Sequence, residues 1–146
     1  MIQAVFAAGE LVACHANIRL REGAGGGSHK RSAALPVARE HMRELGRHLG
    51  WRGALSADAI LTGQGLRYID VNPRLVEPAN ALLAGVDLVT PLLELATGGE
   101  PRPQHPGREG ILTHQLLLAV LGAPQQTGRA RSVRQAGASS PAAMFR

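Results

Sequence analysis

Residues 53–74 read GALSADAILTGQGLRYIDVNPR, two apolar runs on either side of a glycine-rich turn centred on Gln64. This pattern is typical of a β-hairpin. Residues equidistant from Gln64 then face each other, so Asp58 lies opposite Asp70 and Asn72 follows on the same face. Opposed carboxylates in a sheet have Cβ atoms about 4.5–5.5 Å apart and repel each other. We therefore expect a divalent cation between them.

The composition predicts one modest domain. The chain has 146 residues, of which 45% are hydrophobic, enough for a real core but too few for a multi-lobed enzyme. The single cysteine, Cys14, excludes an internal disulfide, and no Cys/His cluster has zinc-ligand spacing. The sequence has no run of 18 apolar residues and no basic start typical of a secretory signal. We therefore expect a cytoplasmic protein with no membrane partner.

The positive charge lies towards the C-terminus. The formal net charge is +5, yet residues 1–100 carry ten Lys/Arg and ten Asp/Glu, whereas residues 101–146 carry six Arg against Glu109. Aromatic residues make up only 3%, which leaves little for bases to stack on. A neutral body with arginines scattered over a Gly/Pro/Ala/Ser-rich end argues against a nucleic-acid partner.

The order of the predicted elements indicates an α+β fold, an antiparallel sheet of about four strands with helices packed on one face. Strands are expected at residues 2–8, 11–20, 53–61 and 66–72, with a glycine-rich loop at 21–32 between the two hairpins. Helices are expected from Pro36 through the stripe Ala38, Met42, Leu45 and Leu49, at 78–83, at 88–96 after an Asp87 cap, and at 111–121. Residues 101–124 form a linker and that last packed helix, and residues 125–146 are expected to be disordered.

Three segments resemble a known family. Trp51-Arg52-Gly53 leads to Asp58, Tyr68-Ile69-Asp70-Val71-Asn72-Pro73-Arg74 ends the second hairpin, and Ala84-Gly85-Val86-Asp87-Leu88 follows. Together with the order of the elements, these segments resemble the C-terminal part of an ATP-grasp domain of the carbamoyl-phosphate synthase and biotin carboxylase type. The resemblance covers roughly residues 1–100 and implies the C-terminal lobe of that fold.

The resemblance implies a ligase that uses ATP and Mg²⁺, with Mn²⁺ as an alternative ion. Such enzymes phosphorylate a carboxylate substrate to an acyl-phosphate, which an amine or similar nucleophile then attacks. By this resemblance Asp58, Asp70 and Asn72 are the metal ligands, which suits Mg²⁺ because it prefers oxygen ligands. Arg74 would bind a phosphate or the substrate carboxylate through its planar fork, on the same face as Asp70 and Asn72.

The glycine-rich segment is a candidate phosphate site. Glycine lets backbone N–H groups approach an anion, and His29, Lys30 and Arg31 follow it, so Lys30 and Arg31 would neutralise charge on a triphosphate or acyl-phosphate. It is not a Walker A loop, because His29 stands where glycine precedes the lysine and Arg31 where Ser or Thr follows. Glycine clusters are also common as plain connectors.

The sequence departs from the family in two ways. Asp58 and Asp70 stand where the family usually has Glu, so each carboxylate reaches less far. The family's N-terminal lobe has no counterpart here, so we expect either a truncated gene product or one half that works with a partner chain or an upstream segment. The alternative is a non-catalytic remnant or interaction module that keeps the lobe without turning over ATP.

Several residues also have simpler interpretations. The Asp-x-Asn-Pro-Arg sequence is by itself a common way to end a strand. Glu77 is a weak candidate for the site, because an acid at a helix start ordinarily interacts with the helix dipole. Packing explains the remaining candidates, which are His15, His41, His48, His114, Trp51, Met42 and a buried, unreactive Cys14.

Overall fold

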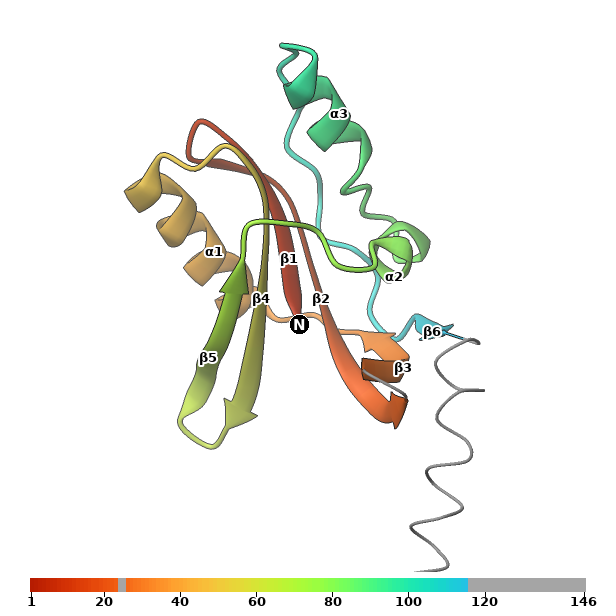
Figure 1. The fold of residues 1–146 in the computed structure, drawn as a ribbon. Helices are drawn as coiled ribbons and strands as arrows, with labels where there is room; N and C mark the ends of the chain where they lie inside the picture. The colour runs from red at the N-terminus through yellow and green to blue at the C-terminus, as the bar shows by residue number, and fades with distance from the viewer. Residues whose placement is uncertain (24–25, 116–146) are drawn as a thin grey trace, which may run out of the picture. The chain divides into compact units, whose positions relative to one another are not determined.

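The computed structural model describes residues 1–23 and 26–115 (Figure 1). Its strands are β1 (Ile2–Ala7), β2 (Glu10–Gly23), β3 (Gly26–Ser32), β4 (Gly53–Thr62), β5 (Gly65–Asn72) and β6 (Leu112–His114), and its helices are α1 (Pro36–Leu49), α2 (Ala79–Leu83) and α3 (Thr90–Ala96). One compact unit comprises Met1–Arg19 and Lys30–Thr113, and a second comprises Leu20–His29 with the segment from His114 onward. The candidate site described below belongs to the first unit.

The predicted α+β class with an antiparallel sheet is confirmed, but the strand count was too low. The described residues form a six-stranded antiparallel sheet in the order β5-β4-β1-β2-β3-β6. Within the segment 21–32, expected to be a loop, residues 21–23 instead extend β2 and residues 26–32 form β3, because pairing with neighbouring strands overrides the weak strand preference of glycine. Residues 112–114 are strand β6 rather than helix. The rest of the helix expected at 111–121, and the tail at 125–146, lie outside the described residues.

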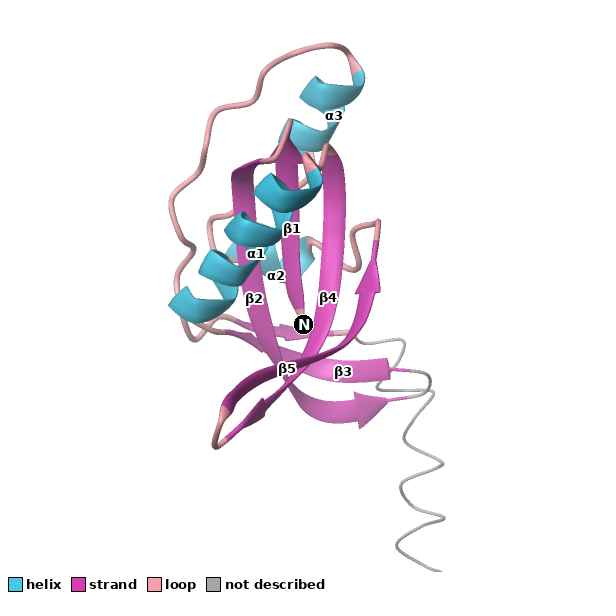
Figure 2. Ribbon diagram, turned by 90° about the vertical axis from the view of Figure 1, so that its left-hand side faces the viewer, coloured by secondary structure: helices cyan, strands magenta, loops and turns pink. Residues whose placement is uncertain are grey.

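Helices pack on both faces of the sheet, so the prediction of one covered face was wrong. In Figures 1 and 2, α1 lies on one side of β1 and β4, and α2 lies on the other. Ile2, Ala4 and Phe6 share a buried cluster with α1, whereas Val5 belongs to a second cluster with α2, α3 and the residues between them. The continuous apolar character of β1 is what burial on both faces requires.

Helix α1 begins and ends as predicted, but near its end Gly46 rather than the predicted Leu49 lies on the buried side. Pro36 occupies its first turn, and Gly50 ends it in a left-handed conformation with φ of 57°. The buried side is formed by Ala38, Met42 and Gly46, whereas Leu49 is 52% exposed. Gly46 takes the inner position because the ring of Phe6 fills the space where a side chain would lie.

Helix α3 starts at Thr90, two residues later than expected. The predicted role of Asp87 is nevertheless visible, because its Oδ1 accepts hydrogen bonds from the N–H groups of Val89 (2.9 Å) and Thr90 (3.0 Å). Two N–H groups at the start of the helix are thereby satisfied.

Substituting Gly46 tests the contact between α1 and β1. A Cβ atom at Gly46 would lie 2.4 Å from two ring carbons of Phe6, which is fully buried. We expect Gly46→Ala to lower the free energy of unfolding by about 1–3 kcal/mol, since the overpacking outweighs the better helix propensity of alanine. Urea unfolding followed by circular dichroism measures this change.

Gly63→Ala is the control, because the Cβ atom added there would have no neighbouring atom within 4 Å among the described residues. A Gly46→Ala protein as stable as the Gly63→Ala protein would contradict this account of the packing.

Candidate metal and phosphate site

The β4–β5 hairpin places Asp58 directly opposite Asp70, as predicted. The reason differs from the one expected. Thr62 pairs with Gly65 across a two-residue turn, and that register by itself would set Asp58 opposite Ile69. The register shifts between Asp58 and Ala59, so Ile69 is the extra residue of a β-bulge and Asp70 moves into the facing position.

Asn72 joins the pair, so the three predicted metal ligands lie together. Its Nδ2 donates a hydrogen bond of 2.7 Å to Oδ2 of Asp70, while its backbone pairs with Ser56. The amide oxygen of Asn72 and the other carboxylate oxygens remain as cation ligands. Among residues 1–23 and 26–115, no cluster of three or more His, Cys, Asp or Glu side chains is arranged to hold a metal. The two acids and one amide therefore fit an ion whose remaining ligands come from water and substrate.

These ligands lie on the face of the sheet opposite α1. Leu55 and Ala57 pack in the α1 cluster, so by alternation Ser56 and Asp58 point to the other side. Strand pairing sets Asn72 beside Ser56, Ser56 beside Gln3, and Gln3 beside His15. A row of polar side chains therefore crosses four strands next to the Asp58–Asp70 pair.

The inner, buried part of this polar row was not predicted from the sequence. Gln3, Asn17 and Ser56 are at most 3% exposed. The signal was present in the alternation of polar and apolar residues in Ile2-Gln3-Ala4 and in Cys14-His15-Ala16-Asn17. Such alternation within two central strands indicates a buried polar face.

Two buried amide groups on this face have an unused donor. Within the described residues, Nε2 of Gln3 and Nδ2 of Asn17 have no hydrogen-bond partner. Oε1 of Gln3 accepts a hydrogen bond of 2.7 Å from the N–H of Val76. An unpaired buried donor costs about 1–3 kcal/mol. These donors are therefore suited to acceptor oxygens brought in by a ligand.

Lys30 forms an ion pair with Glu77, a residue that the sequence indicated only weakly. Nζ of Lys30 donates to Oε2 of Glu77, and the two side chains are 10% and 33% exposed. Glu77 has a φ of 55°, a conformation that non-glycine residues seldom adopt and that often marks functional positions. Burial lowers the pKa of the Met1 amino group. The charge of Asp58 raises this pKa, whereas the charges of Arg19 and Lys30 lower it. Asp58 and Lys30 therefore both lie near the start of β1.

His29 and Arg31 were predicted to bind phosphate together with Lys30. Arg31 is exposed and follows the buried Lys30 on β3, so the two side chains leave the strand on opposite faces. His29 belongs to the second unit, where its ring centre lies 4.2 Å from that of His114. Lys30 and Arg31 therefore face opposite sides of β3, and the roles of His29, Lys30 and Arg31 in phosphate binding stay predictions.

Arg74 lies beyond the end of β5. Its N–H donates to the carbonyl of Asn72 over 2.9 Å, so the chain turns tightly at Pro73. Strand alternation ends at Asn72 and does not determine where the exposed Arg74 side chain points. Its role at the site stays a prediction.

The inner part of the polar face is covered, since Gln3 is fully buried and accepts its hydrogen bond from Val76, whereas Asp58 is half-buried and Asp70 exposed at the hairpin. Two hollows lie within the described part of the chain, one beside Cys14 and Arg39 and the other between Asp87 and Arg102. No helix in this part is long and apolar enough to cross a membrane.

No protein-family model matches the sequence, and no curated protein matches it.

A double-mutant cycle tests the Lys30–Glu77 pair. Lys30→Met leaves a half-buried carboxylate unpaired, and Glu77→Gln leaves a buried ammonium group unpaired. We expect each single variant to lose stability and the double variant to lose less than their sum, with a coupling energy of about 1 kcal/mol because Glu77 is partly solvated. Urea unfolding of the four proteins measures the coupling. Strictly additive losses would contradict the pairing.

The pH dependence of stability tests the environment of His15. Its Nε2 donates to Oδ1 of Asn80 (2.8 Å), whose Nδ2 donates to Ile111 O and Thr113 Oγ1. Burial lowers the pKa of His15 below 6.5, an effect that the Asn80 hydrogen bond only partly offsets. The folded protein thus favours neutral His15. The stability that neutral His15 contributes is complete above the pKa that His15 has in the unfolded chain, and it is lost as the pH falls below that value.

We expect the unfolding free energy of the wild-type protein to fall between about pH 7.5 and pH 5, and that of His15→Gln to fall less. His48→Gln, at an exposed position on α1, is the matched control and should follow the wild type. Parallel curves for all three proteins would refute this description of His15.

Proposed function

We propose that the polar face of the first unit is one wall of a Mg·ATP site in an ATP-grasp-type ligase. The observation that carries this proposal is the Asp58–Asp70 pair with Asn72, on the same sheet face as the unused donors of Gln3 and Asn17. Cation ligands and anion donors side by side are what a metal-bound polyphosphate requires. The sequence resemblance supplies the family and the reaction class.

The cation would be Mg²⁺, with Mn²⁺ as a substitute. Magnesium is commonly held by one or two carboxylates, with water and phosphate oxygens completing its octahedron. Asp58 and Asp70 would supply the carboxylates, and the Asn72 amide oxygen a third ligand. Since aspartate is shorter than the glutamate of the family, the ion would lie closer to the sheet.

The phosphates would extend across the polar row. Gln3 Nε2 and Asn17 Nδ2 would donate to phosphate oxygens, and Lys30, with Arg74 from the end of the hairpin, would neutralise charge. A substrate carboxylate oxygen attacks the γ-phosphorus and ADP leaves. An amine then attacks the acyl-phosphate carbon, and inorganic phosphate leaves. The residues do not specify which carboxylate is used, because specificity resides in the surrounding pocket.

Asp70 is exposed and Asp58 is half-buried, so the second wall of the site would come from a partner chain or an upstream segment. A second candidate function, a remnant or interaction module without turnover, is favoured by one observation. Lys30 is already neutralised by Glu77. Ion and nucleotide binding therefore need to be measured separately.

Paramagnetic broadening by Mn²⁺ locates the cation site. In ¹H–¹⁵N spectra of the wild-type protein, we expect substoichiometric Mn²⁺ to broaden the amide signals of residues 58 and 70–72 first. Asp70→Asn keeps the shape of the side chain but removes its charge, and should weaken Mn²⁺ binding about tenfold or more. Glu94→Gln, on the exposed side of α3, is the control with equal loss of charge. Broadening that spares residues 58 and 70–72 would refute the site.

Calorimetry with Mg·ATP separates the two functions. The ligase predicts binding that is weakened in Asp70→Asn and unchanged in Glu94→Gln. Mn²⁺ binding at Asp58 and Asp70 without any Mg·ATP binding would favour the remnant.

A further inference from the structure

A pocket of about 130 Å³ lies at the edge of β2, and His15 at the end of the polar row is part of its lining. Its lining includes Cys14 and Ala16 of β2, Leu35 and Ala38 at the start of α1, and Gly107. Ala16 O accepts a hydrogen bond from Ala33 N (3.0 Å), and Val12 O accepts one from Gln104 N (2.7 Å). The pocket therefore lies between these two hydrogen bonds, which join neighbouring chain segments to this edge of β2.

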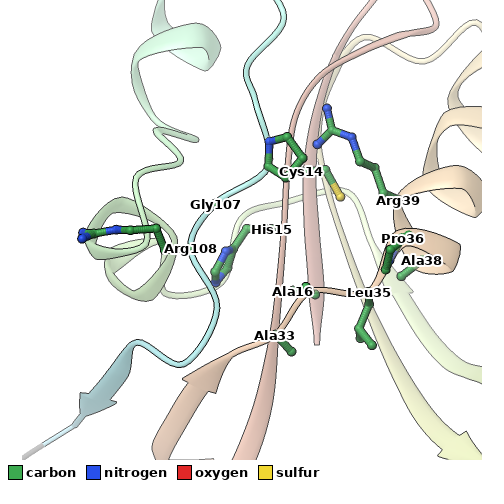
Figure 3. A pocket seen from close by; sticks show the side chains of 12 residues that line it. Cys14, His15, Ala16, Ala33, Leu35, Pro36, Ala38, Arg39, Gly107 and Arg108 are labelled. Atoms are coloured by element: carbon green, nitrogen blue, oxygen red, sulfur yellow. The ribbon is translucent and has the colours of Figure 1, made fainter.

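Arg39 is half-buried, and its guanidinium group has unused hydrogen-bonding capacity. Figure 3 shows its side chain extending from α1 towards Cys14. Nη2 donates to Gln104 O over 3.1 Å, whereas the buried Nη1 has no hydrogen-bond partner within residues 1–23 and 26–115. The ion pairs within these residues do not include Arg39. A buried guanidinium N–H without an acceptor is an unsatisfied donor, and a carboxylate oxygen is a suitable partner for it.

The surroundings of Arg39 favour an anion. The pocket lining contains no Asp or Glu; its other arginine, Arg108, extends away from Arg39 in Figure 3 and donates to Leu83 O over 3.0 Å. Helix α1 starts at the pocket without a side-chain cap and without an acidic residue in its first turn. Burial raises the pKa of the Cys14 thiol to about 11, so this neighbour is neutral at physiological pH and does not balance the guanidinium charge. Peptide groups two residues apart on a strand point the same way, so the N–H of Cys14 faces the same edge as that of Ala16.

Apart from His15 and the two arginines, the lining is mostly apolar and consists largely of alanine, leucine and proline. An apolar cavity of about 150 Å³ holds one benzene molecule, so the pocket here admits only a few carbon atoms. We propose that it binds a small aliphatic monocarboxylate, whose carboxylate pairs with Arg39 and whose alkyl end packs against Ala16, Leu35 and Ala38.

This site is independent of the proposed ligase site. Cys14 and Ala16 belong to the α1 cluster, and the register of β1 and β4 places Leu55 and Ala57 on that same face. Asp58 follows Ala57 and points to the opposite face. A carboxylate bound at Arg39 is therefore not the one phosphorylated at Asp58 and Asp70, and it would act as an accessory ligand.

Sodium butyrate is the probe, and butyramide is its uncharged analogue of similar shape. In ¹H–¹⁵N titrations of the full chain, we expect butyrate to shift the amides of Cys14, Ala34 and Gly107 with saturation and a Kd of about 1 mM. Butyramide should bind at least tenfold more weakly, because it cannot form the charged pair. This comparison uses the wild-type protein and does not depend on the folding of any variant.

Arg39→Gln should weaken butyrate binding at least tenfold, whereas Arg67→Gln, which removes an equal charge on the β4–β5 hairpin, should not. The proposal is overturned if butyrate produces no saturable shifts at Cys14, Ala34 and Gly107, if butyramide binds equally well, or if a folded Arg39→Gln protein binds as the wild type does.

Discussion

The central constraint on the first unit is that β1 is covered on both faces, with a different chemistry on each side. Ile2, Ala4 and Phe6 pack against α1, while Gln3 and Val5 point to the side of α2 and α3. Because side chains alternate along a strand, one six-residue segment supplies an apolar core on one side and part of a polar floor on the other. The positions of β2 and β4, and hence of the polar row, follow from their pairing with β1.

The candidate site depends on a local irregularity in the next hairpin. A regular ladder continued from the two-residue turn would pair Asp58 with Ile69 and turn Asp70 to the other face. The bulge at Ile69 reverses the orientation of the last residues of β5. As a result Asp70 and Asn72 join Asp58 beside Ser56 and Gln3. Bulges commonly redirect side chains next to functional sites in this way.

The bulge at Ile69, not the turn alone, sets Asp58 opposite Asp70, although equal spacing from Gln64 led to the same pair being predicted. Their partners on the polar face were not predicted. Gln3 and Asn17 lie far from the hairpin in sequence, and only the sheet order brings them beside it. The Lys30–Glu77 pair spans 47 positions and depends on β3, a strand hidden in a glycine-rich segment whose composition indicates a loop.

The sequence by itself determined the α+β class, both hairpins and the limits of α1, because these depend on local periodicity, turn residues and caps. Tertiary structure alone decided that helices cover both faces, that β3 and β6 complete the sheet, that a bulge brings Asp70 opposite Asp58, and that Nη1 of Arg39 is buried without a partner among the described residues. These features arise from contacts between residues distant along the chain. Their free energy depends on which surfaces meet, and no local pattern records that.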